Sequence, residues 1–284
     1  MEIVNLEYPM NSIVQDVNKP CVMALGFFDG LHKGHRKIME IAKAIAKKEK
    51  LTFTVMTFFP HPSNVIPSSR KIDHYITPLP IKKQLFKEVG VERLIIVNFN
   101  TNFSKLSHQQ FVEEYLVGLN CKHVLAGFDF TYGFKGQGNM EQIVSDSKGR
   151  FEVTTVGKVV SREEKISSTM VRELLQNGDV HKIPSVLGDC YSISAYITQV
   201  EKSFAHNLEV EFDADYLLPS SGLYRVKILV GNHIVFGMVK VHDENIGTLV
   251  IKVEHIPIKV EQRAVKILFI SRLGIDSFRN KRII

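Results

Sequence analysis

Two histidines, His32 and His35, lie three residues apart in the segment Gly26–His35, which reads GFFDGLHKGH. A short apolar run precedes this segment and an amphipathic run at helical spacing follows it, so the histidines lie where a strand turns into a helix. Backbone N–H groups at a helix start bind anions, and glycines such as Gly34 let a phosphate approach the backbone closely. This turn therefore predicts a site that handles phosphate groups with imidazoles.

A second cluster of hydrogen-bonding residues comes late in the chain. Ser167, Ser168 and Thr169 lie at the start of a helix expected at 168–176, and Arg172 follows one turn later. Serine and threonine are common N-caps, which is a purely structural explanation. An N-cap is also an anion site, so both explanations hold together and the cluster is a candidate phosphate site.

The first two thirds of the chain alternate between strand-like and helix-like patterns, which favours a parallel sheet with helices on both faces, a Rossmann-like α/β fold. In such sheets ligands bind at the carboxyl ends of the strands, so the candidate residues are expected to meet at one edge. The expected strands are 21–25, 51–57, 93–97 and 123–126, and the expected helices are 36–50, 80–89 and 108–119.

From about residue 191 the pattern changes to short runs rich in β-branched residues with turns between them, which predicts a small antiparallel β-barrel. The expected strands are 191–200, 208–212, 222–230, 234–241, 247–255 and 265–270. We therefore expect two domains, residues 1–184 and 185–284.

The composition suits a packed soluble protein, with 44% hydrophobic and 23% charged residues among 284. No apolar run is long enough to span a bilayer and the first residues lack a signal-peptide pattern, so a cytoplasmic location is expected. The net charge of +6 comes from dispersed lysines, which argues against nucleic acid and suits anionic small molecules. Cys21, Cys121 and Cys190 lack metal-ligand spacing and are expected to be reduced and buried.

Five segments resemble, in the same order, the motif blocks of the bacterial FAD synthetases, the riboflavin kinase/FMN adenylyltransferase family. They are Gly26–His35, Thr57–Pro62, Phe99–Phe111, Gly127–Gly133 and Ile166–Arg172. The first block carries the His-x-Gly-His signature of the wider nucleotidyltransferase superfamily. Together the blocks cover roughly residues 20–180.

The resemblance implies transfer of AMP from ATP to FMN, which yields FAD and pyrophosphate with Mg²⁺ assisting. His32 and His35 would contact the ATP phosphates, Arg172 would face the β- and γ-phosphates, and all three are candidate catalytic residues. The other candidates for binding ATP are Gly26, Phe27, Phe28, Asp29, Gly34, Ser167, Ser168 and Thr169. The candidates for binding the flavin are Pro60, His61, Pro62, Phe128, Asp129 and Phe130. Aromatic residues at alternating positions, such as Phe128 and Phe130, belong more often to the core than to the wall of a ligand site.

Asp29 has two interpretations: its carboxylate could orient the turn or help to place Mg²⁺. The sequence contains no metal-ligand motif, so no metal-binding residues are predicted, and Mg²⁺ follows from the chemistry of ATP alone. The sequence leaves the oligomeric state open.

The C-terminal part departs from the family. Bifunctional members have a glycine-rich entry with a Pro-Thr-Ala-Asn element that holds metal and phosphates, and residues 195–208 lack both. A strand entry at 219–224 is retained, whereas Glu254 is a poor candidate for the kinase base. We therefore expect an inactive riboflavin-kinase-like barrel.

The resulting prediction is a monofunctional FAD synthetase. Three alternatives remain: a bifunctional riboflavin kinase/FAD synthetase, a nucleotidyltransferase with another phosphorylated acceptor, and a regulator that senses flavin or nucleotide, whose barrel binds flavin or RNA. An inactive enzyme is disfavoured because the candidate phosphate-binding residues are present: His32, His35, Ser167, Thr169 and Arg172.

Overall fold

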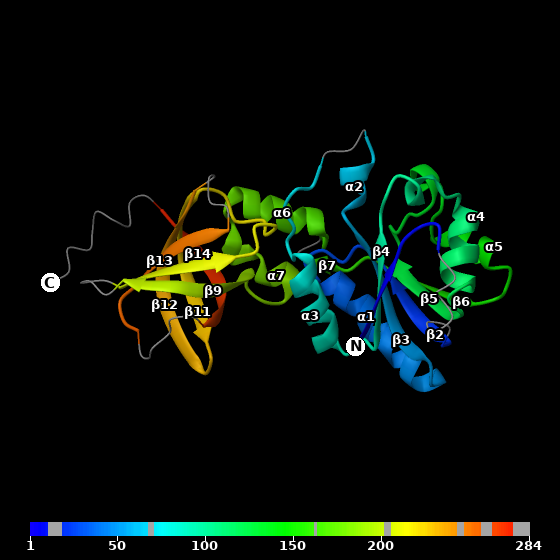
Figure 1. Cartoon of the computed structure of the whole chain (residues 1–284), viewed down its shortest axis with the longest axis horizontal. Coiled ribbons are helices and arrows are strands. Elements are labelled where there is room, and N and C mark those ends of the chain that lie inside the picture. The colour runs from blue at the N-terminus through cyan, green and yellow to red at the C-terminus, as the bar shows by residue number, and fades with distance from the viewer. Residues whose placement is uncertain are drawn as a thin grey trace. The chain divides into compact units, whose positions relative to one another are not determined.

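The computed structural model describes residues 1–10, 19–67, 71–161, 164–201, 206–242, 247–256 and 263–274 (Figure 1). These residues form two compact units. The first contains Met1–Asp73 and Leu79–Ile166, and the second contains His74–Pro78 and the chain from Ser167 onward. The units divide after Ile166, and the expected domains, residues 1–184 and 185–284, stay a prediction.

A parallel sheet forms the centre of the first unit, as the sequence predicts. In the described residues it has six strands in the order β1-β4-β3-β2-β5-β6, and every neighbouring pair is parallel. The strands are β1 Glu2–Leu6, β2 Cys21–Leu25, β3 Thr52–Phe59, β4 Arg93–Asn98, β5 Cys121–Gly127 and β6 Glu152–Val156. The chain therefore has the predicted Rossmann-like α/β architecture.

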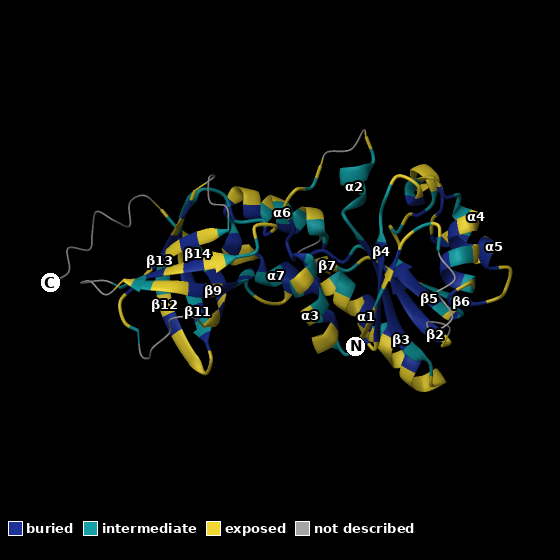
Figure 2. Ribbon diagram, viewed as in Figure 1, coloured by how far each residue is buried: buried dark blue, intermediate teal, exposed yellow. Residues whose placement is uncertain are grey.

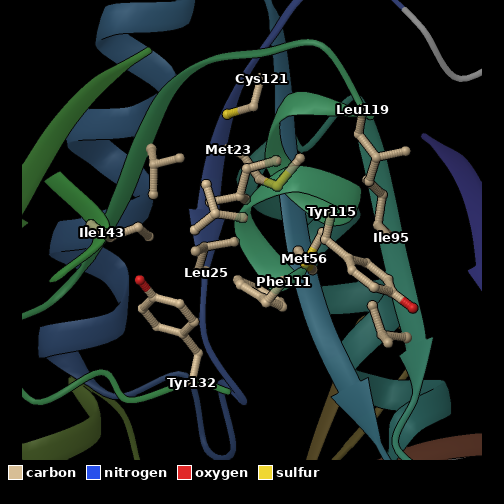
Figure 3. Close-up of a cluster of buried hydrophobic side chains, with 14 of the residues drawn as sticks. Met23, Leu25, Met56, Ile95, Phe111, Tyr115, Leu119, Cys121, Tyr132 and Ile143 are labelled. Carbon is tan, nitrogen blue, oxygen red and sulfur yellow. The ribbon is translucent and has the colours of Figure 1, made fainter. Parts of the chain in front are cut away.

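Helices cover both faces of this sheet because its central strands are apolar on both sides. Along β2, Met23 and Leu25 belong to one hydrophobic cluster and Val22 and Ala24 to the other. Figure 3 shows the first cluster, and Figure 2 shows the exposed outer surface of the helix after β2. The helical segments are α1 Lys33–Glu49, α2 Pro62–Val65, α3 Leu79–Val89, η2 Phe103–Lys105, α4 His108–Phe111, the π-helical η3 Val112–Val117, η4 Phe134–Gly136 and α5 Met140–Ser147.

The second unit is built around a closed antiparallel barrel with the strand order β10-β13-β12-β11-β14-β9, which confirms the predicted barrel. The strands are β9 Ser192–Glu201, β10 His206–Phe212, β11 Gly222–Val230, β12 His233–Val241, β13 Thr248–Val253 and β14 Ala264–Leu273. Three helical segments precede them: α6 Ser168–Asn177, η5 Val180–Lys182 and α7 Pro184–Leu187. A short hairpin of β7 Val160–Ser161 and β8 Glu164–Lys165 belongs to the first unit.

The three cysteines are free thiols. Cys21 and Cys121 are buried opposite each other on β2 and β5, as expected for small apolar residues. Cys190 is only half-buried, which differs from the expectation. Among the described residues, no helix has the length and apolarity that crossing a membrane requires.

Candidate active site

The loop that contains the two histidines begins at the end of β2, beside β5. The chain leaves β2 toward β3 on one side, and β5 lies on the other, so the two loops after β2 and β5 diverge in opposite directions. At such a switch in strand order a crevice opens at the carboxyl ends of the strands, and ligands bind there. The segments Gly26–His35 and Gly127–Gly133 both start at this edge, as predicted.

The imidazoles of His32 and His35 stack on each other at the start of α1, with their centroids 3.5 Å apart and an interplanar angle of 19°. His32 is the N-cap of α1, and its Nδ1 accepts the backbone N–H of His35 at 3.3 Å. Because Nδ1 of neutral His32 is the acceptor, its proton resides on Nε2. The buried Nδ1 of His35 has no partner among the described residues, which is a costly arrangement unless a ligand supplies one.

Both imidazoles are held neutral. Burial lowers the pKa of His32 to about 4, with Asp129 opposing the shift and Lys165 adding to it. Burial also lowers the pKa of His35 well below its usual value, and the neighbouring His32 and Lys82 add to this effect. Near pH 7 the two rings are therefore hydrogen-bond donors of the N–H type rather than cations.

The depressed pKa of His32 makes folding stability depend on pH. Between pH 6.5 and pH 4 the unfolded chain binds a proton at His32 that the folded chain does not, so stability is highest above pH 6.5 and falls as the pH drops toward 4. The difference between these two values corresponds to about 3 kcal/mol. His32→Asn removes the titrating group and retains a capping side chain. The free energy of unfolding lost between pH 7 and pH 4, measured with urea, should therefore be about 3 kcal/mol smaller in this variant than in the wild type. Equal losses in the two proteins would contradict the assignment.

The turn between β2 and α1 depends on unusual backbone conformations. Phe28, Gly30 and Leu31 have φ of 56°, 83° and 38°, in the left-handed region that glycine prefers. A Cβ on Gly34 would lie 3.1 Å from two atoms of the His32 ring, so this glycine leaves room for the stacked imidazoles. The carboxylate of Asp29 lies in the same turn and is almost fully buried.

The ring of His61 packs against this turn. Its ring meets the Phe27 ring edge-on, with centroids 4.4 Å apart. Its Nδ1 accepts the backbone N–H of Ser63 at 3.1 Å, so that His61 caps α2 between Pro60 and Pro62. The predicted second block therefore lies beside the first.

The loop after β5 places a charged pair near His32. Asp129 forms an ion pair with Lys165 of β8, and both charges affect the pKa of His32. The Lys165 ammonium lies 4.8 Å from the centroid of the exposed Phe128 ring. Phe130 instead packs on Tyr132, with centroids 6.0 Å apart, at the margin of the hydrophobic core.

An apolar cavity of about 140 Å³ lies next to these loops. Its lining includes Phe58, Pro62, Phe99, Phe103, Phe111 and Tyr132. Of the six residues predicted to bind the flavin, Pro62 alone is in this lining, and Phe128, Asp129 and Phe130 are not. The aromatic residues of the middle block, Phe99–Phe111, supply much of the wall.

The late serine-rich cluster belongs to the second unit. Ser167 caps α6 by accepting the backbone N–H of Met170 at 3.2 Å, so the predicted N-cap is present. Arg172 donates to the backbone carbonyl of His74 at 2.9 Å within the same unit. The sequence predicts that this cluster lies close to the paired histidines, and this stays a prediction for Ser167, Ser168, Thr169 and Arg172.

Sequence reasoning missed two lysines of this region, Lys82 and Lys165. The Lys82 ammonium is 2.8 Å from the carbonyl oxygen of Phe27, and the residue is only 1% exposed. Its position four residues before the buried Phe86 was an available signal, because residues at this spacing share a helix face. Lys165 had no such signal. Across the described part of the chain, no three His, Cys, Asp or Glu side chains gather as they do around a metal ion.

Comparisons with known proteins agree on one family. The family model described as FAD synthetase matches residues 14–170. The bifunctional riboflavin kinase/FMN adenylyltransferases of Listeria monocytogenes and Bacillus subtilis are 39% and 38% identical, covering 85% and 84% of this chain and 78% and 76% of their own lengths. A protein named FAD synthetase from Listeria monocytogenes is 30% identical over 73% of this chain and 81% of its own.

A solved structure from Streptococcus pneumoniae, described as a macrolide-efflux protein, has the same fold. It superposes with a TM-score of 0.80 and covers 97% of this chain and 95% of its own, at 24% identity. At this identity the likeness supports the fold alone.

Proposed function

The chain belongs to the FAD synthetase family, and on this premise we propose how its residues transfer AMP from ATP to FMN. The activity is that of an FMN adenylyltransferase. The observation that carries the assignment of roles is the pair of stacked, neutral imidazoles at the start of α1, at the switch in strand order.

In the proposed reaction a phosphate oxygen of FMN attacks the α-phosphorus of ATP. The new P–O bond forms as the bond to the bridging oxygen breaks, and the electron pair leaves with pyrophosphate. No covalent enzyme intermediate is needed, so catalysis comes from positioning and from neutralising negative charge. His32 and His35 donate N–H groups to the phosphates, and the start of α1 adds its positive dipole end.

Residues 167–172 are also proposed to bind the triphosphate, as the resemblance to the family implies. The Arg172 guanidinium pairs with the β- and γ-phosphates, and Ser167, Ser168 and Thr169 offer hydroxyl and backbone donors at the start of α6. Support comes from the N-cap geometry of Ser167, since the start of a helix is suited to anions. Gly26, Phe27, Phe28 and Gly34 line the phosphate path on the first unit.

Mg²⁺ would be supplied as its complex with ATP. Its ligands would be mainly phosphate oxygens and waters, with at most one or two protein carboxylates. Asp29 fits this limited part because its carboxylate lies in the turn that carries the histidines. The ion would neutralise charge on the departing pyrophosphate.

The flavin ring is proposed to enter the apolar cavity with one edge, since 140 Å³ is smaller than the roughly 300 Å³ or more of sites that hold a whole ligand. Pro60, His61 and Pro62 frame this side of the site. Phe128, Asp129 and Phe130 are proposed to flank the part of the flavin nearer to the phosphate. The use of ATP and FMN supports a cytoplasmic enzyme.

We propose that residues 1–184 carry the adenylyltransferase and that the barrel of residues 185–284 has lost riboflavin kinase activity. Where bifunctional members have their glycine-rich entry, β9 and β10 pair with each other from Asn207 opposite Glu201 to Phe212 opposite Ala195. Backbone groups used in this ladder are not available to wrap around phosphates. The names of the relatives from Listeria monocytogenes and Bacillus subtilis make a bifunctional enzyme the second candidate.

Two product assays with purified protein, ATP and Mg²⁺ test these proposals, one with FMN and one with riboflavin. FAD from FMN, with riboflavin left unchanged, is the expected result. FMN or FAD from riboflavin would show a surviving kinase. If neither mixture yields FAD, including with reduced FMN, another acceptor or a regulatory role replaces the proposal.

A further inference from the structure

Lys82 is a buried cation against the histidine-containing turn. It lies on α3, one helical turn before the buried Phe86, and is 1% exposed. Its Nζ donates to the carbonyl oxygen of Phe27 at 2.8 Å and lies 4.0 Å from the centroid of the Phe27 ring. Burying an ammonium group costs several kcal/mol unless its surroundings compensate. Its contacts with Phe27 therefore tie this charge to the turn.

The Phe27 carbonyl accepts a second hydrogen bond, from Oγ1 of Thr57 on β3 at 2.9 Å. Two donors from separate elements thus fix the orientation of one peptide plane. Because N–H and C=O point in opposite directions across a trans peptide, the N–H of Phe28 points away from Lys82. Phe28 itself has φ of 56°, a conformation that persists only where its surroundings enforce it.

We propose that Lys82 is a positioning residue for adenylyl transfer: its ammonium holds the Phe27 carbonyl and so fixes the turn that presents His32 and His35. The inference rests on the proposed role of these histidines. Lys82 acts through the backbone and through its charge, and it need not touch ATP or FMN.

The charge of Lys82 also acts on His35. After burial and the neighbouring His32, Lys82 is a cause of the lowered pKa of His35. Replacing Lys82 with an uncharged residue should therefore raise the pKa of His35. A residue with a merely structural role in packing would leave that pKa unchanged.

The experiment compares Lys82→Met with the exposed Lys87→Met on the same helix. We expect Lys82→Met to lower kcat for FAD formation about 10- to 100-fold with little change in the KM for FMN. The His35 signal in NMR should titrate at a higher pH. Lys87→Met should behave as the wild type. Thr57→Val removes the other donor, and its effect on kcat should combine non-additively with that of Lys82→Met because both act on one carbonyl.

The outcomes separate the inference from the proposed function. A wild-type protein that makes no FAD from ATP and FMN overturns both. An active wild type together with an unchanged kcat in Lys82→Met overturns the inference alone, and so does a lower kcat without a shift in the titration of His35. If Lys82→Met does not fold, Thr57→Val carries the test, and an unchanged kcat in that variant overturns the inference.

Discussion

Replacement of His35 by asparagine should lower kcat for FAD formation about 10²- to 10³-fold, the usual loss when one donor to a developing oxyanion is removed. His35 is stacked on His32 and meets the Phe28 ring edge-on at 5.1 Å, so its position is fixed before substrate binds. The ring packing directs the N–H group of His35, and an asparagine amide loses this ring packing. Steady-state kinetics with FMN and MgATP measure the loss.

The binding of FMN should not change in this variant, because His35 is assigned to the phosphates of ATP. Lys37→Ala is the matched control, since Lys37 lies one half-turn further along α1 and forms an exposed pair with Glu40. A kcat within threefold of the wild type in His35→Asn would contradict the assigned role. A large rise in the Kd for FMN would move His35 to the flavin side of the site.

The central strands were predictable from the sequence because a parallel strand covered on both faces is a continuous apolar run. The expected strand 21–25 matches β2, and 93–97 falls one residue short of β4. The edge strands β1 and β6 were missed since each has two or more exposed residues and therefore no such run. The helix expected at 108–119 is present as α4 followed by the π-helical η3, a change of winding that periodicity does not reveal.

Within the site, the local features were predictable and the tertiary ones were not. The turn with His32 and His35 is encoded by neighbouring residues, so spacing alone places both rings at the start of a helix. Lys82 looks like any helical lysine, and only the packing of α3 against the turn buries its ammonium beside Phe27. Lys165 likewise becomes part of the site through its ion pair with Asp129, which is 36 residues away in sequence.

Replacement of Phe111 by alanine should destabilise the protein by about 3–5 kcal/mol, because it leaves a cavity among aromatic side chains. Phe111 is 2% exposed and stacks on Tyr115, with centroids 5.6 Å apart and planes within 13°. Its ring also lies 5.0 Å from that of Tyr132, centroid to centroid (Figure 3). Urea unfolding followed by circular dichroism measures the loss.

The same residue lines the apolar cavity, so its removal tests the flavin site as well as the core. Phe111→Leu retains most of the side-chain volume and should lower the free energy of unfolding by less than about 1.5 kcal/mol. Phe236→Ala is the exposed control: this side chain on the barrel is 62% exposed, and its removal should change stability by about 0.5 kcal/mol or less. If one edge of the flavin enters the cavity, Phe111→Leu should raise the KM for FMN and leave that for ATP unchanged. An unaltered KM for FMN in a folded Phe111→Leu enzyme would place the flavin ring elsewhere, because a change in the cavity wall should alter the binding of any ligand that contacts it.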